Sequence, residues 1–494
     1  MKWIVYNLLF AFVYPFLLPG FLARMLKRGG YAARMGDRFA LYPEGLFGKN
    51  RPLFDSHAAQ SNNQTIKQSN NSFVWVHAVS VGEVQVAGQL MREWRKVEPD
   101  VRFCFSTTSS TGWKMAEREL GVGVDGRCRV DGDVLIYNPL DFPNFVKSAL
   151  KTVKPRAIIL TESEIWPNFI RTAKKMGIPL FPINARVSDR SAPRYKAAKW
   201  FFGEVLSSFT KIFAQSDLDK ARLVAAGAPT DKVEVTGSFK FDVAHRNEAK
   251  EKELREWILG SNRVDSDAKD LKQTLNVPKI LLGGSTWPGE DEVLLGIYKR
   301  LTQTPNNSKT QTLLVIAPRH FEKADAIEAN IRKYGFACIR RSRESKSKDE
   351  VEQRKNLESA VRLGTSPSPV YLADTTGELM GLYGIADVVF VGKSLCAHGS
   401  QNMIEPCLCG KPTLVGPYTE NFRPVMSDLL ASDAIIQVKD AKELEEKIGE
   451  LFTSLASGQE TASPLSGLGA RAKAAVEKRL GVVAKCVSEI RGAL

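Results

Sequence analysis

Residues 73–94 read FVWVHAVSVGEVQVAGQLMREW, and this stretch decides the fold because its hydrophobic period changes halfway along. The run Phe73–Val79 is apolar apart from His77, which is typical of a strand buried on both faces of a sheet. Beyond Gly82 the apolar residues recur at helical spacing as far as Trp94. A strand, a tight turn and a helix start in succession predict one βα unit of a parallel sheet.

Glu83 stands directly after this turn, where a helix start usually presents its N–H groups to an anion. A carboxylate there would repel a phosphate, so this turn is not predicted to hold one. The same position suits a base that receives a proton from a hydroxyl group, because the helix N-terminus keeps the carboxylate ionised. A helix-capping glutamate without a chemical role is the alternative.

The composition indicates a globular protein with an anionic partner. The chain has 494 residues, enough for two domains, and carries a net charge of +14 with a pI of about 9.3. Nucleic acid, an anionic membrane surface and a phosphorylated substrate all fit this charge. The seven cysteines form no visible disulfide framework, and the five histidines show no zinc spacing, which argues against a metal-centred mechanism.

The N-terminal residues Trp3–Ala23 are uncharged and mostly apolar, and about 20 such residues span a bilayer. The cations Arg24, Lys27 and Arg28 follow them, so the positive-inside rule places the rest of the chain in the cytoplasm. We therefore expect residues 1–28 to form a membrane anchor. A cleaved signal peptide and a hairpin dipping into one leaflet are the alternatives.

Two rounds of alternating strand and helix patterns predict two doubly wound α/β domains. We expect an N-terminal domain over residues 29–260, with a polar, flexible insertion at 56–72, and a C-terminal domain over residues 261–494. Ligands of such folds bind beyond the carboxyl ends of the strands, here in a cleft between the domains. The charged residues 244–274 read as a connection, and residues 340–369 as a surface excursion. The predicted strands are Phe73–Val79, Val101–Ser106, Ala157–Leu160, Leu180–Asn184, Lys211–Ala214, Val233–Thr236, Lys279–Gly283, Thr312–Ile316, Ala337–Ile339, Val370–Leu372, Val388–Val391 and Thr413–Val415.

Charged side chains follow several predicted strands of the first domain. The segment TESEIWPN at 161–168 puts Glu162 and Glu164 at a strand end, although acids are also common at helix starts for electrostatic reasons alone. Arg186 and Arg190 belong to a basic segment that suits phosphate groups, with a solvated basic helix as the alternative. Lys240 comes just after another strand.

The second domain repeats this arrangement with hydroxyl, arginine and carboxylate side chains. Ser285 and Thr286 lie in a Gly-rich turn that can cradle a phosphate, and Arg319 follows the next strand. A long loop leads to Asn402 and Glu405, and a carboxylate there can accept both hydroxyls of a ribose.

Seven motifs, in this order, resemble those of the 3-deoxy-D-manno-octulosonic acid (Kdo) transferases of lipopolysaccharide synthesis. The family resemblance implies a GT-B glycosyltransferase architecture, CMP-Kdo as donor and an anionic lipid A precursor as acceptor. It implies no metal, no cofactor and no nucleic acid, and a place at the inner membrane with the catalytic domains on the cytoplasmic side. The motifs are HAVSVGE (77–83), TESEIWPN (161–168), RVSDRS (186–191), GSFKFD (237–242), APRH (317–320), DTTGEL (374–379) and NMIEP (402–406).

The resemblance also assigns roles. Glu83 matches the catalytic base, and Glu164 and Lys240 match residues thought to stabilise the transition state. Ser285, Thr286, Arg186 and Arg190 are further candidates for contacts with donor or acceptor anions. The residues that match CMP-contacting segments are Pro318, Arg319, Thr376, Gly377, Glu378, Asn402, Met403, Ile404 and Glu405.

The chain departs from the family pattern at Trp287, where the family usually has His, and at Ser400 and Gln401, where it has Gly and His. Two other functions remain open on the sequence alone. One is a different membrane-associated GT-B transferase that uses a nucleotide-diphosphate sugar. The other is a membrane-anchored binding protein without catalysis.

Overall fold

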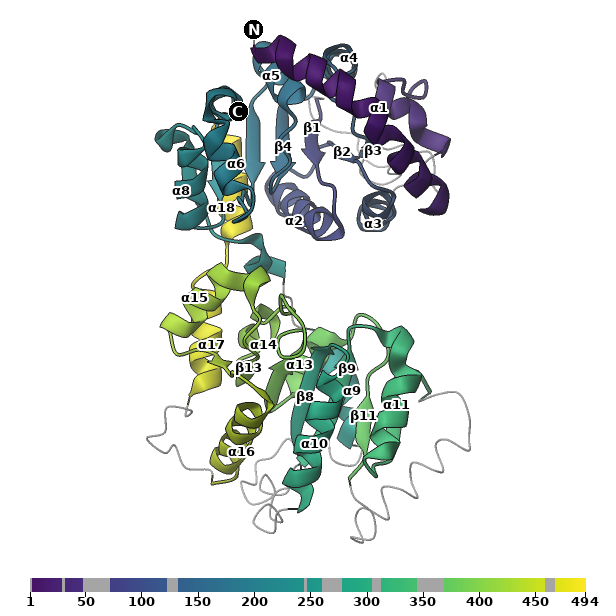
Figure 1. The fold of residues 1–494 in the computed structure, drawn as a ribbon, viewed down its shortest axis with the longest axis vertical. Helices are drawn as coiled ribbons and strands as arrows, with labels where there is room; N and C mark the ends of the chain where they lie inside the picture. The colour runs from purple at the N-terminus through teal and green to yellow at the C-terminus, as the bar shows by residue number, and fades with distance from the viewer. Residues whose placement is uncertain are drawn as a thin grey trace, which may run out of the picture. The chain divides into compact units, whose positions relative to one another are not determined.

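The structure is a computed structural model that describes residues 2–28, 32–47, 72–121, 132–243, 247–259, 278–303, 312–343, 368–457 and 467–494. Residues 56–71 of the predicted insertion and 344–367 of the predicted surface excursion lie outside this part of the chain. The chain forms two compact units, both visible in Figure 1. Unit 1 comprises Met1–Val243 and Gly481–Leu494, and unit 2 comprises Ala244–Leu480.

Unit 1 is built on a five-stranded parallel sheet in the order β3-β2-β1-β4-β5. A two-stranded parallel sheet, β6-β7, continues from β5 through a bridge between Ala185 and Ala214. The strands are β1 (Val74–His77), β2 (Phe103–Thr107), β3 (Val134–Tyr137), β4 (Ala157–Thr161), β5 (Leu180–Ile183), β6 (Ile212–Ala214) and β7 (Val233–Val235). The helices are α1 (Lys2–Arg28), η1 (Ala32–Phe39), α2 (Val81–Val97), α3 (Ser110–Leu120), α4 (Pro143–Val153), α5 (Pro167–Lys175), α6 (Ala192–Ala197), α7 (Lys199–Ser207), α8 (Asp217–Ala225), η2 (Thr230–Lys232), η3 (Phe239–Val243) and α18 (Val482–Gly492).

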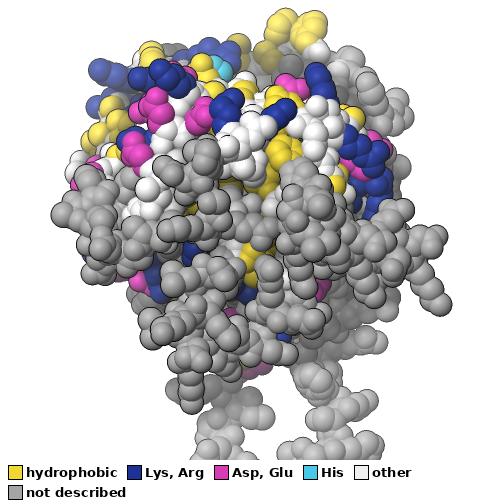
Figure 2. Space-filling view, turned by 90° about the horizontal axis from the view of Figure 1, so that it is seen from below, with side chains coloured by type: hydrophobic (Ala, Val, Ile, Leu, Met, Phe, Trp, Pro, Cys, Tyr) yellow, Lys and Arg dark blue, Asp and Glu magenta, His cyan; other side chains and the backbone are white. Residues whose placement is uncertain are grey.

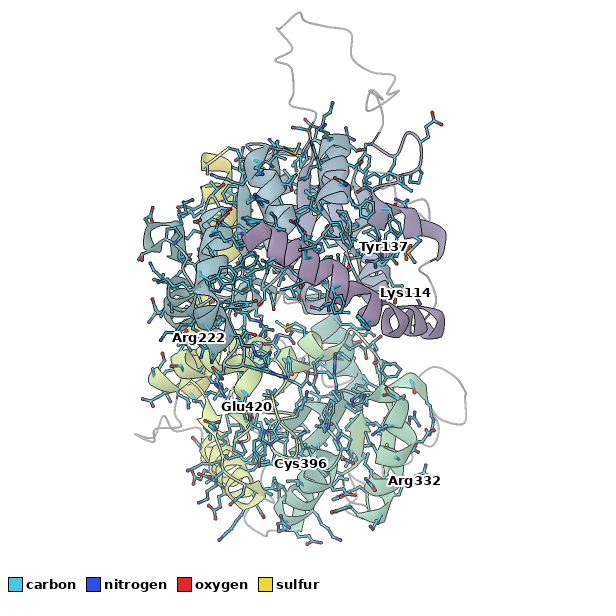
Figure 3. All side chains as sticks on the ribbon, turned by 45° about the horizontal axis from the view of Figure 1, so that its top comes forward. Lys114, Tyr137, Arg222, Arg332, Cys396 and Glu420 are labelled. Carbon is cyan, nitrogen blue, oxygen red and sulfur yellow. The ribbon has the colours of Figure 1, made fainter. Side chains whose placement is uncertain are left out.

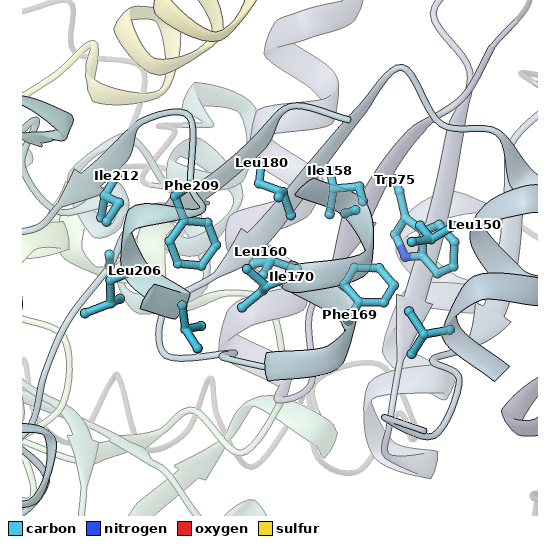
Figure 4. Packing of buried hydrophobic residues seen from close by; sticks show 14 of the residues in the cluster. Trp75, Leu150, Ile158, Leu160, Phe169, Ile170, Leu180, Leu206, Phe209 and Ile212 are labelled. Carbon is cyan, nitrogen blue, oxygen red and sulfur yellow. The ribbon is translucent and has the colours of Figure 1, made fainter. Parts of the chain in front are cut away.

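Successive strand residues point to opposite faces of this sheet, and helices cover both faces. Trp75, Ile158 and Leu160 pack on one face against α4, α5 and α7, as the close view in Figure 4 shows. Val74 and Val76 pack on the other face against α2, α3 and α18. A fully buried side chain of this size contributes about 1.5–3 kcal/mol, so the uninterrupted apolar runs that predicted buried strands also hold the unit together.

Unit 2 contains a seven-stranded parallel sheet in the order β10-β11-β9-β8-β12-β13-β14. One of its faces packs against α10, α11 and α16. The strands are β8 (Lys279–Thr286), β9 (Thr312–Pro318), β10 (Cys338–Arg340), β11 (Val370–Leu372), β12 (Val388–Val391), β13 (Thr413–Val415) and β14 (Ile436–Gln437). The helices are α9 (Glu248–Leu259), α10 (Glu290–Gln303), η7 (Phe321–Lys323), α11 (Ala324–Lys333), η8 (Arg341–Arg343), α13 (Leu379–Ile385), α14 (Ile404–Leu408), η9 (Glu420–Phe422), α15 (Arg423–Ala431), α16 (Ala441–Ser457) and α17 (Leu468–Glu477).

The units divide the chain differently from the domains expected at 29–260 and 261–494. Residues 248–259, read as part of a charged connection, form α9, whose Trp257 ring packs on Tyr371 of β11 at 5.4 Å. The Tyr371 hydroxyl also donates a hydrogen bond to the carbonyl of Ile258 (2.8 Å). At the other end of the chain, α18 buries Val483 and Val487 in the core of unit 1. Each segment therefore joins the unit that buries its apolar side chains.

Among the described residues, no helix combines the length and the hydropathy that crossing a bilayer requires. The predicted membrane-spanning anchor at residues 1–28 is therefore not supported.

The first turns of α1 pack instead on unit 1. The Trp3 ring lies 5.4 Å from the ring of Phe201 on α7, and its Nε1 donates a hydrogen bond to Glu204 (2.6 Å). The Phe10 ring lies 5.0 Å from that of Phe142. In Figure 1, α1 runs across α4 and α5. Hydropathy cannot distinguish a membrane span from a helix with one face packed on protein, because it counts apolar residues without their partners.

Asp141 connects α1 to the start of α5. Its carboxylate accepts hydrogen bonds from the backbone N–H groups of Asn168 (3.0 Å) and Phe169 (2.8 Å) and from the hydroxyl of Tyr6 (2.9 Å). Only 1% of the residue is exposed. Burial raises the pKa of Asp141 to about 7, and these hydrogen bonds only partly offset that effect.

We expect Asp141 to make folding pH-dependent. Because its pKa is raised in the folded state, its contribution to stability is complete below about pH 4 and is lost as the pH rises through about 7. Between pH 5 and pH 8 the free energy of unfolding should fall by about 2 kcal/mol more in the wild type than in Asp141→Asn. Urea unfolding of both proteins over this range measures the difference, and parallel pH profiles would contradict the prediction.

Candidate functional site

The loops after β1 and β4 are the natural place for a site in unit 1. These strands are neighbours in the sheet, yet α2 follows β1 on one face whereas α5 follows β4 on the other. Such a point, where the strand order reverses, is where ligands bind in open parallel sheets. The register pairs His77 with Leu160, which brings the residues after each strand side by side.

Glu83 lies in the first turn of α2, and its carboxylate is held from several sides. Oε2 accepts hydrogen bonds from the N–H of Val79 (2.8 Å) and the hydroxyl of Thr161 at the end of β4 (3.2 Å). Oε1 accepts one from Ser80, whose Oγ in turn accepts the N–H of Glu83. This reciprocal pair resembles a capping box, but the backbone N–H that the Glu83 carboxylate accepts is that of Val79, not that of the N-cap residue Ser80. Glu83 therefore caps the helix, and it remains half-buried at the strand ends.

Glu162, Arg186 and Lys240 form a charged group beside Glu83. The Arg186 Nε lies 2.8 Å from Oε2 of Glu162, and Asn184 donates a longer hydrogen bond to the other oxygen (3.4 Å). Burial raises the pKa of Glu162, Arg186 and Lys240 lower it, and the charge of Glu83 raises it further. Burial lowers the pKa of Lys240, an effect that Glu162 opposes and Arg186 reinforces.

The backbone around this group is shaped to bring it together. Glu162 and Asn184 both adopt left-handed conformations, with φ of 50° and 51°. The Asn184 side chain accepts a hydrogen bond from the N–H of Phe239 (3.1 Å), which fixes η3 and thereby Lys240. Such conformations are uncommon in residues other than glycine and often mark functional positions.

Glu164 lies on the same loop but has different partners. Its Oε2 accepts a hydrogen bond from the indole N–H of Trp166 (2.9 Å) and lies 3.5 Å from Nε2 of His77. One fifth of its side chain is exposed. Glu83, Glu164 and Lys240, predicted on separate motifs, thus all lie around the carboxyl ends of the strands of unit 1.

The basic segment after β5 contributes one residue to this group. Arg186 pairs with Glu162, whereas Arg190 is exposed on the loop before α6. Nearby, Arg222, labelled in Figure 3, forms an ion pair with Asp189. Where Figure 2 shows described side chains, Lys and Arg stand interspersed with Asp and Glu.

In unit 2 the strand order reverses between β8 and β12, and a buried carboxylate joins their loops. Glu290, at the start of α10, has no exposed surface. Its oxygens accept hydrogen bonds from five backbone N–H groups at 2.8–3.3 Å. The donors are Trp287, Lys393, Ser394, Leu395 and Cys396, the last of which is labelled in Figure 3. Backbone N–H groups that converge in this way bind anions, and here the chain's own carboxylate fills the position.

The ring of Trp287 lies against two basic residues, His320 and Lys393, at this edge of the sheet. Its ring lies 4.6 Å from the ring of His320, and the Lys393 ammonium lies 4.9 Å from its centroid. Arg319, beside His320, is exposed, and its N–H donates a hydrogen bond to the carbonyl of Thr286 (3.0 Å). The arrangement offers an aromatic surface next to positive charge, which suits a nucleobase or a phosphate.

The Thr376–Glu378 segment divides between surface and interior. Thr376 and Gly377 are exposed, whereas Glu378 is buried and bonded to Arg341, Lys250 and Thr375. Burial would raise the pKa of Glu378, but these hydrogen bonds hold it at about 2. Glu378 therefore neutralises its own cations, which leaves the exposed pair as the part of this motif that a ligand can reach.

The remaining predicted donor residues lie close to the same loop. Asn402 donates a hydrogen bond to Glu405 (2.9 Å), and burial raises the pKa of Glu405, which Asn402 partly offsets. Met403 and Ile404 have no exposed surface, so a contact from this pair would come from the backbone. Three further predicted positions, at the ends of β8 and β9, are buried or partly buried rather than open: Ser285, Thr286 and Pro318. Ser400, in the loop after β12, is also buried.

Sequence reasoning assigned no role to His77, Glu162, Asn184 or Glu290. His77 and Glu162 lie within the motifs at 77–83 and 161–168. For Glu162, the signal in the sequence is an acidic residue directly after a predicted strand. Nothing local identifies four of the five partners of Glu290, which lie 103 to 106 residues away. Within the described part of the chain, no group of three His, Cys, Asp or Glu side chains could hold a metal ion.

A family model described as 3-deoxy-D-manno-octulosonic-acid transferase (kdotransferase) matches residues 33–243. The 3-deoxy-D-manno-octulosonic acid transferase of Haemophilus influenzae is 31% identical over 77% of this chain and 79% of its own length. That of Bordetella pertussis is 33% identical over 75% and 77%. A bifunctional glycosyltransferase/methyltransferase of Fusobacterium nucleatum is longer, and the chain spans 54% of it.

A solved glycosyltransferase from Rickettsia africae has the same fold, with a TM-score of 0.50 and 12% identity. The alignment covers 85% of this chain and 98% of that one. This likeness and the two parallel sheets agree with the GT-B type of α/β fold predicted from the sequence.

The geometry around Glu290 predicts a large effect of a small change. Glu290→Gln replaces one acceptor oxygen by an NH₂ group, so at least two of the five N–H groups lose their acceptor. Each buried unsatisfied group costs about 1–3 kcal/mol, and we expect a loss of about 3 kcal/mol in stability. Urea unfolding measures it, and amide exchange at 393–396 should accelerate. Glu292→Gln, exposed on the same helix, should change stability by less than about 0.5 kcal/mol. Equal stability of the two variants would contradict the prediction.

Proposed function

Since the chain belongs to the 3-deoxy-D-manno-octulosonic acid (Kdo) transferase family, we propose that it moves Kdo from CMP-Kdo to a lipid A precursor of lipid IVA type. The chain is thus a glycosyltransferase. We further propose that Glu83 is the general base and that the reaction needs no metal.

The observation that carries this proposal is the position of Glu83 where the strand order of unit 1 reverses. An acceptor hydroxyl must lose its proton as its oxygen bonds to the anomeric carbon of Kdo, while the bond from that carbon to the phosphate breaks and CMP leaves with the electron pair. A half-buried carboxylate at this edge is suited to take the proton. Its hydrogen bonds from Val79 and Thr161 fix its orientation, so its help lies mainly in its position.

Fixed positive charge supports catalysis without a metal. CMP leaves as a monophosphate, and Kdo carries a carboxylate of its own. Arg186 and Lys240 lie beside Glu162, and cations held in place stabilise negative charge that develops during the reaction. Glu164 is proposed to stabilise the transition state from the neighbouring loop, and Arg190 to meet a phosphate of the acceptor.

We propose that CMP binds to unit 2 at the edge formed by the ends of β8, β9 and β12. Arg319 supplies an exposed guanidinium for the phosphate. Glu405, half-buried and held by Asn402, suits the two hydroxyls of a ribose. Trp287 replaces the histidine usual in the family, and its ring already lies against Lys393 and His320.

We propose that α1 brings the enzyme to the cytoplasmic face of the inner membrane by lying on it rather than by crossing it. The side chains opposite the packed face of α1 are apolar and exposed: 64% at Ile4, 65% at Leu8, 68% at Phe12 and 72% at Phe16. Four such residues on one helix face form a surface that a lipid bilayer can cover.

The test of the function is a transfer reaction with purified protein, CMP-Kdo and a tetraacylated lipid A precursor. Mass spectrometry of the lipid should show the addition of Kdo, and the reaction should continue in the presence of EDTA. CMP should raise the thermal unfolding midpoint, and UDP should not. Unmodified lipid, or protection by UDP alone, would refute the proposed reaction.

Glu83→Gln should separate catalysis from helix capping. The amide keeps the shape but cannot take a proton, so turnover should fall by about 10²–10⁴-fold. CMP affinity should not change, because the proposed donor residues belong to unit 2, and stability should fall by no more than about 1 kcal/mol. Glu93→Gln, on the same helix and paired with Lys96, is the matched control. If Glu83 served only as a cap, stability would fall while turnover stayed near that of Glu93→Gln.

A double variant of α1 tests the lipid contact. Leu8→Ser with Phe12→Ser removes exposed apolar surface, and burial of such side chains contributes about 1.5–3 kcal/mol each when complete. Binding to anionic vesicles should weaken by about tenfold or more, while turnover on detergent-dispersed lipid stays normal. Leu218→Ser on α8, equally apolar and 55% exposed, should bind vesicles like the wild type. Unchanged binding of the double variant would exclude this face.

A further inference from the structure

His77 is a buried histidine whose two ring nitrogens have unlike surroundings. It ends β1 with 1% of its surface exposed. Nδ1 lies 2.8 Å from the hydroxyl oxygen of Ser106 on β2 and 3.1 Å from the carbonyl oxygen of the same residue. A carbonyl oxygen can only accept, so the hydrogen-bond network assigns a proton to Nδ1.

The other contacts of Ser106 agree with that assignment. Its hydroxyl oxygen accepts the indole N–H of Trp75 (2.7 Å), and the hydroxyl itself donates to Oδ1 of Asn138 (3.3 Å). The hydroxyl proton is therefore used elsewhere, and the remaining lone pair of Ser106 is available to the N–H of His77. The ring of His77 is fixed in orientation by these two acceptor oxygens of Ser106 and by the parallel pairing of β1 with β2.

Nε2 of His77 points at a carboxylate. Among the described residues this buried nitrogen has no hydrogen-bond partner, and Oε2 of Glu164 lies 3.5 Å from it. In a neutral ring with its proton on Nδ1, Nε2 would present a lone pair to a carboxylate lone pair, and the two would repel. A proton between them turns this repulsion into attraction.

The carboxylate side of the pair is arranged for the ionised form. The indole of Trp166 donates its N–H to the same Oε2 (2.9 Å), and a hydrogen bond to a carboxylate favours its charged state. Across the described residues, Oε1 of Glu164 has no hydrogen-bond donor, and it is the oxygen that remains free for a substrate. The other titratable groups close by are Glu83, reached through Thr161, and Tyr195 of α6.

We infer that His77 is an imidazolium whose Nε2–H is donated to Glu164, and that it is a positioning residue for this carboxylate. Trp166 and His77 together hold Oε2 and turn Oε1 outward. No covalent bond other than this N–H is involved, and the proton stays within the pair. The catalytic consequence rests on the proposed function: a charged, oriented Glu164 stabilises positive charge that develops on the sugar as CMP departs.

The protonation state is tested without any activity measurement. The chain has five histidines, so a full-length sample labelled with ¹⁵N at histidine gives five pairs of ring-nitrogen signals, and His77→Gln identifies the pair of His77. At pH 7 both nitrogens of His77 should have shifts of the protonated type. In Glu164→Gln, Nε2 should change to the unprotonated, pyridine-like type.

Glu162→Gln is the matched control for this measurement, because Glu162 lies on the same loop but pairs with Arg186. The His77 signals should be the same in this variant as in the wild type. A pyridine-like Nε2 in the wild type, or His77 shifts that do not respond to Glu164→Gln, would overturn the inference whether or not the protein transfers Kdo.

Two variants of His77 test its effect on turnover. The amide nitrogen of His77→Asn lies close to where Nδ1 was, whereas that of His77→Gln reaches toward Nε2 and can still donate to Glu164. We expect kcat to fall by about ten- to hundredfold in His77→Asn, the effect of losing one charge-assisted hydrogen bond, with KM for CMP-Kdo unchanged. His77→Gln should recover a good part of that loss.

Equal losses in the two variants, with wild-type CMP affinity and unfolding midpoints, would show that the group facing Glu164 has no part in turnover. If the wild type transfers no Kdo at all, the proposed function fails, while the NMR result still decides the state of the His77–Glu164 pair.

Discussion

The parallel pairing of β1 with β4 is the constraint on which the chemistry of unit 1 depends. Val74 pairs with Ala157 and His77 with Leu160, so the two strands end level with each other. Hydrogen bonds from Thr161 to the carbonyl of His77 and to Glu83 then join the two ends. A shift of one residue would turn Trp75 and Ile158 away from their core and would also separate the carboxylates. Packing and catalysis therefore depend on the same register.

In both units, carboxylate side chains hold helix starts and loops in place by accepting backbone N–H groups. Glu83 and Asp141 accept backbone N–H groups at the starts of α2 and α5, and Glu290 does so for an entire loop. Exposure distinguishes their uses, because Glu290 and Asp141 are closed off whereas Glu83 is only half-buried. A carboxylate whose lone pairs are all taken by N–H groups is part of the scaffold. One that keeps a lone pair open to solvent can also accept a proton from a substrate.

The strands that consist of continuous apolar runs could be predicted from the sequence. Strands such as Val388–Val391 and Val370–Leu372 match the observed bounds, because a buried parallel strand is apolar throughout. The short run Val134–Tyr137 was not assigned, since four apolar residues fit a strand or a helix equally well. Helix α9 was read as a connection because its few apolar residues stand among many charges, and only Tyr371 reveals what they pack on.

The motifs correctly placed the charged residues of the candidate site at strand ends, but they did not predict which side chains these residues pair with. The acids after β4 were predicted to lie at the sheet edge, and they do. Which of them pairs with Arg186 depends on a left-handed residue at 162, which no local pattern announces. The same holds for α1, whose apolar sequence is compatible with lipid on all sides until Trp3 and Phe10 are seen against unit 1.

The return of α18 to unit 1 affects how this protein is made. Asp242, just before the chain leaves unit 1, accepts hydrogen bonds from the N–H groups of Gly481 and Val483, where the chain comes back. Val487 and Ile490 then fill the sheet face that α2 covers in part. During synthesis this face stays incomplete until all of residues 244–480 have been translated. The first unit to leave the ribosome is consequently the last to close its core, and it needs protection from aggregation for as long as unit 2 takes to emerge.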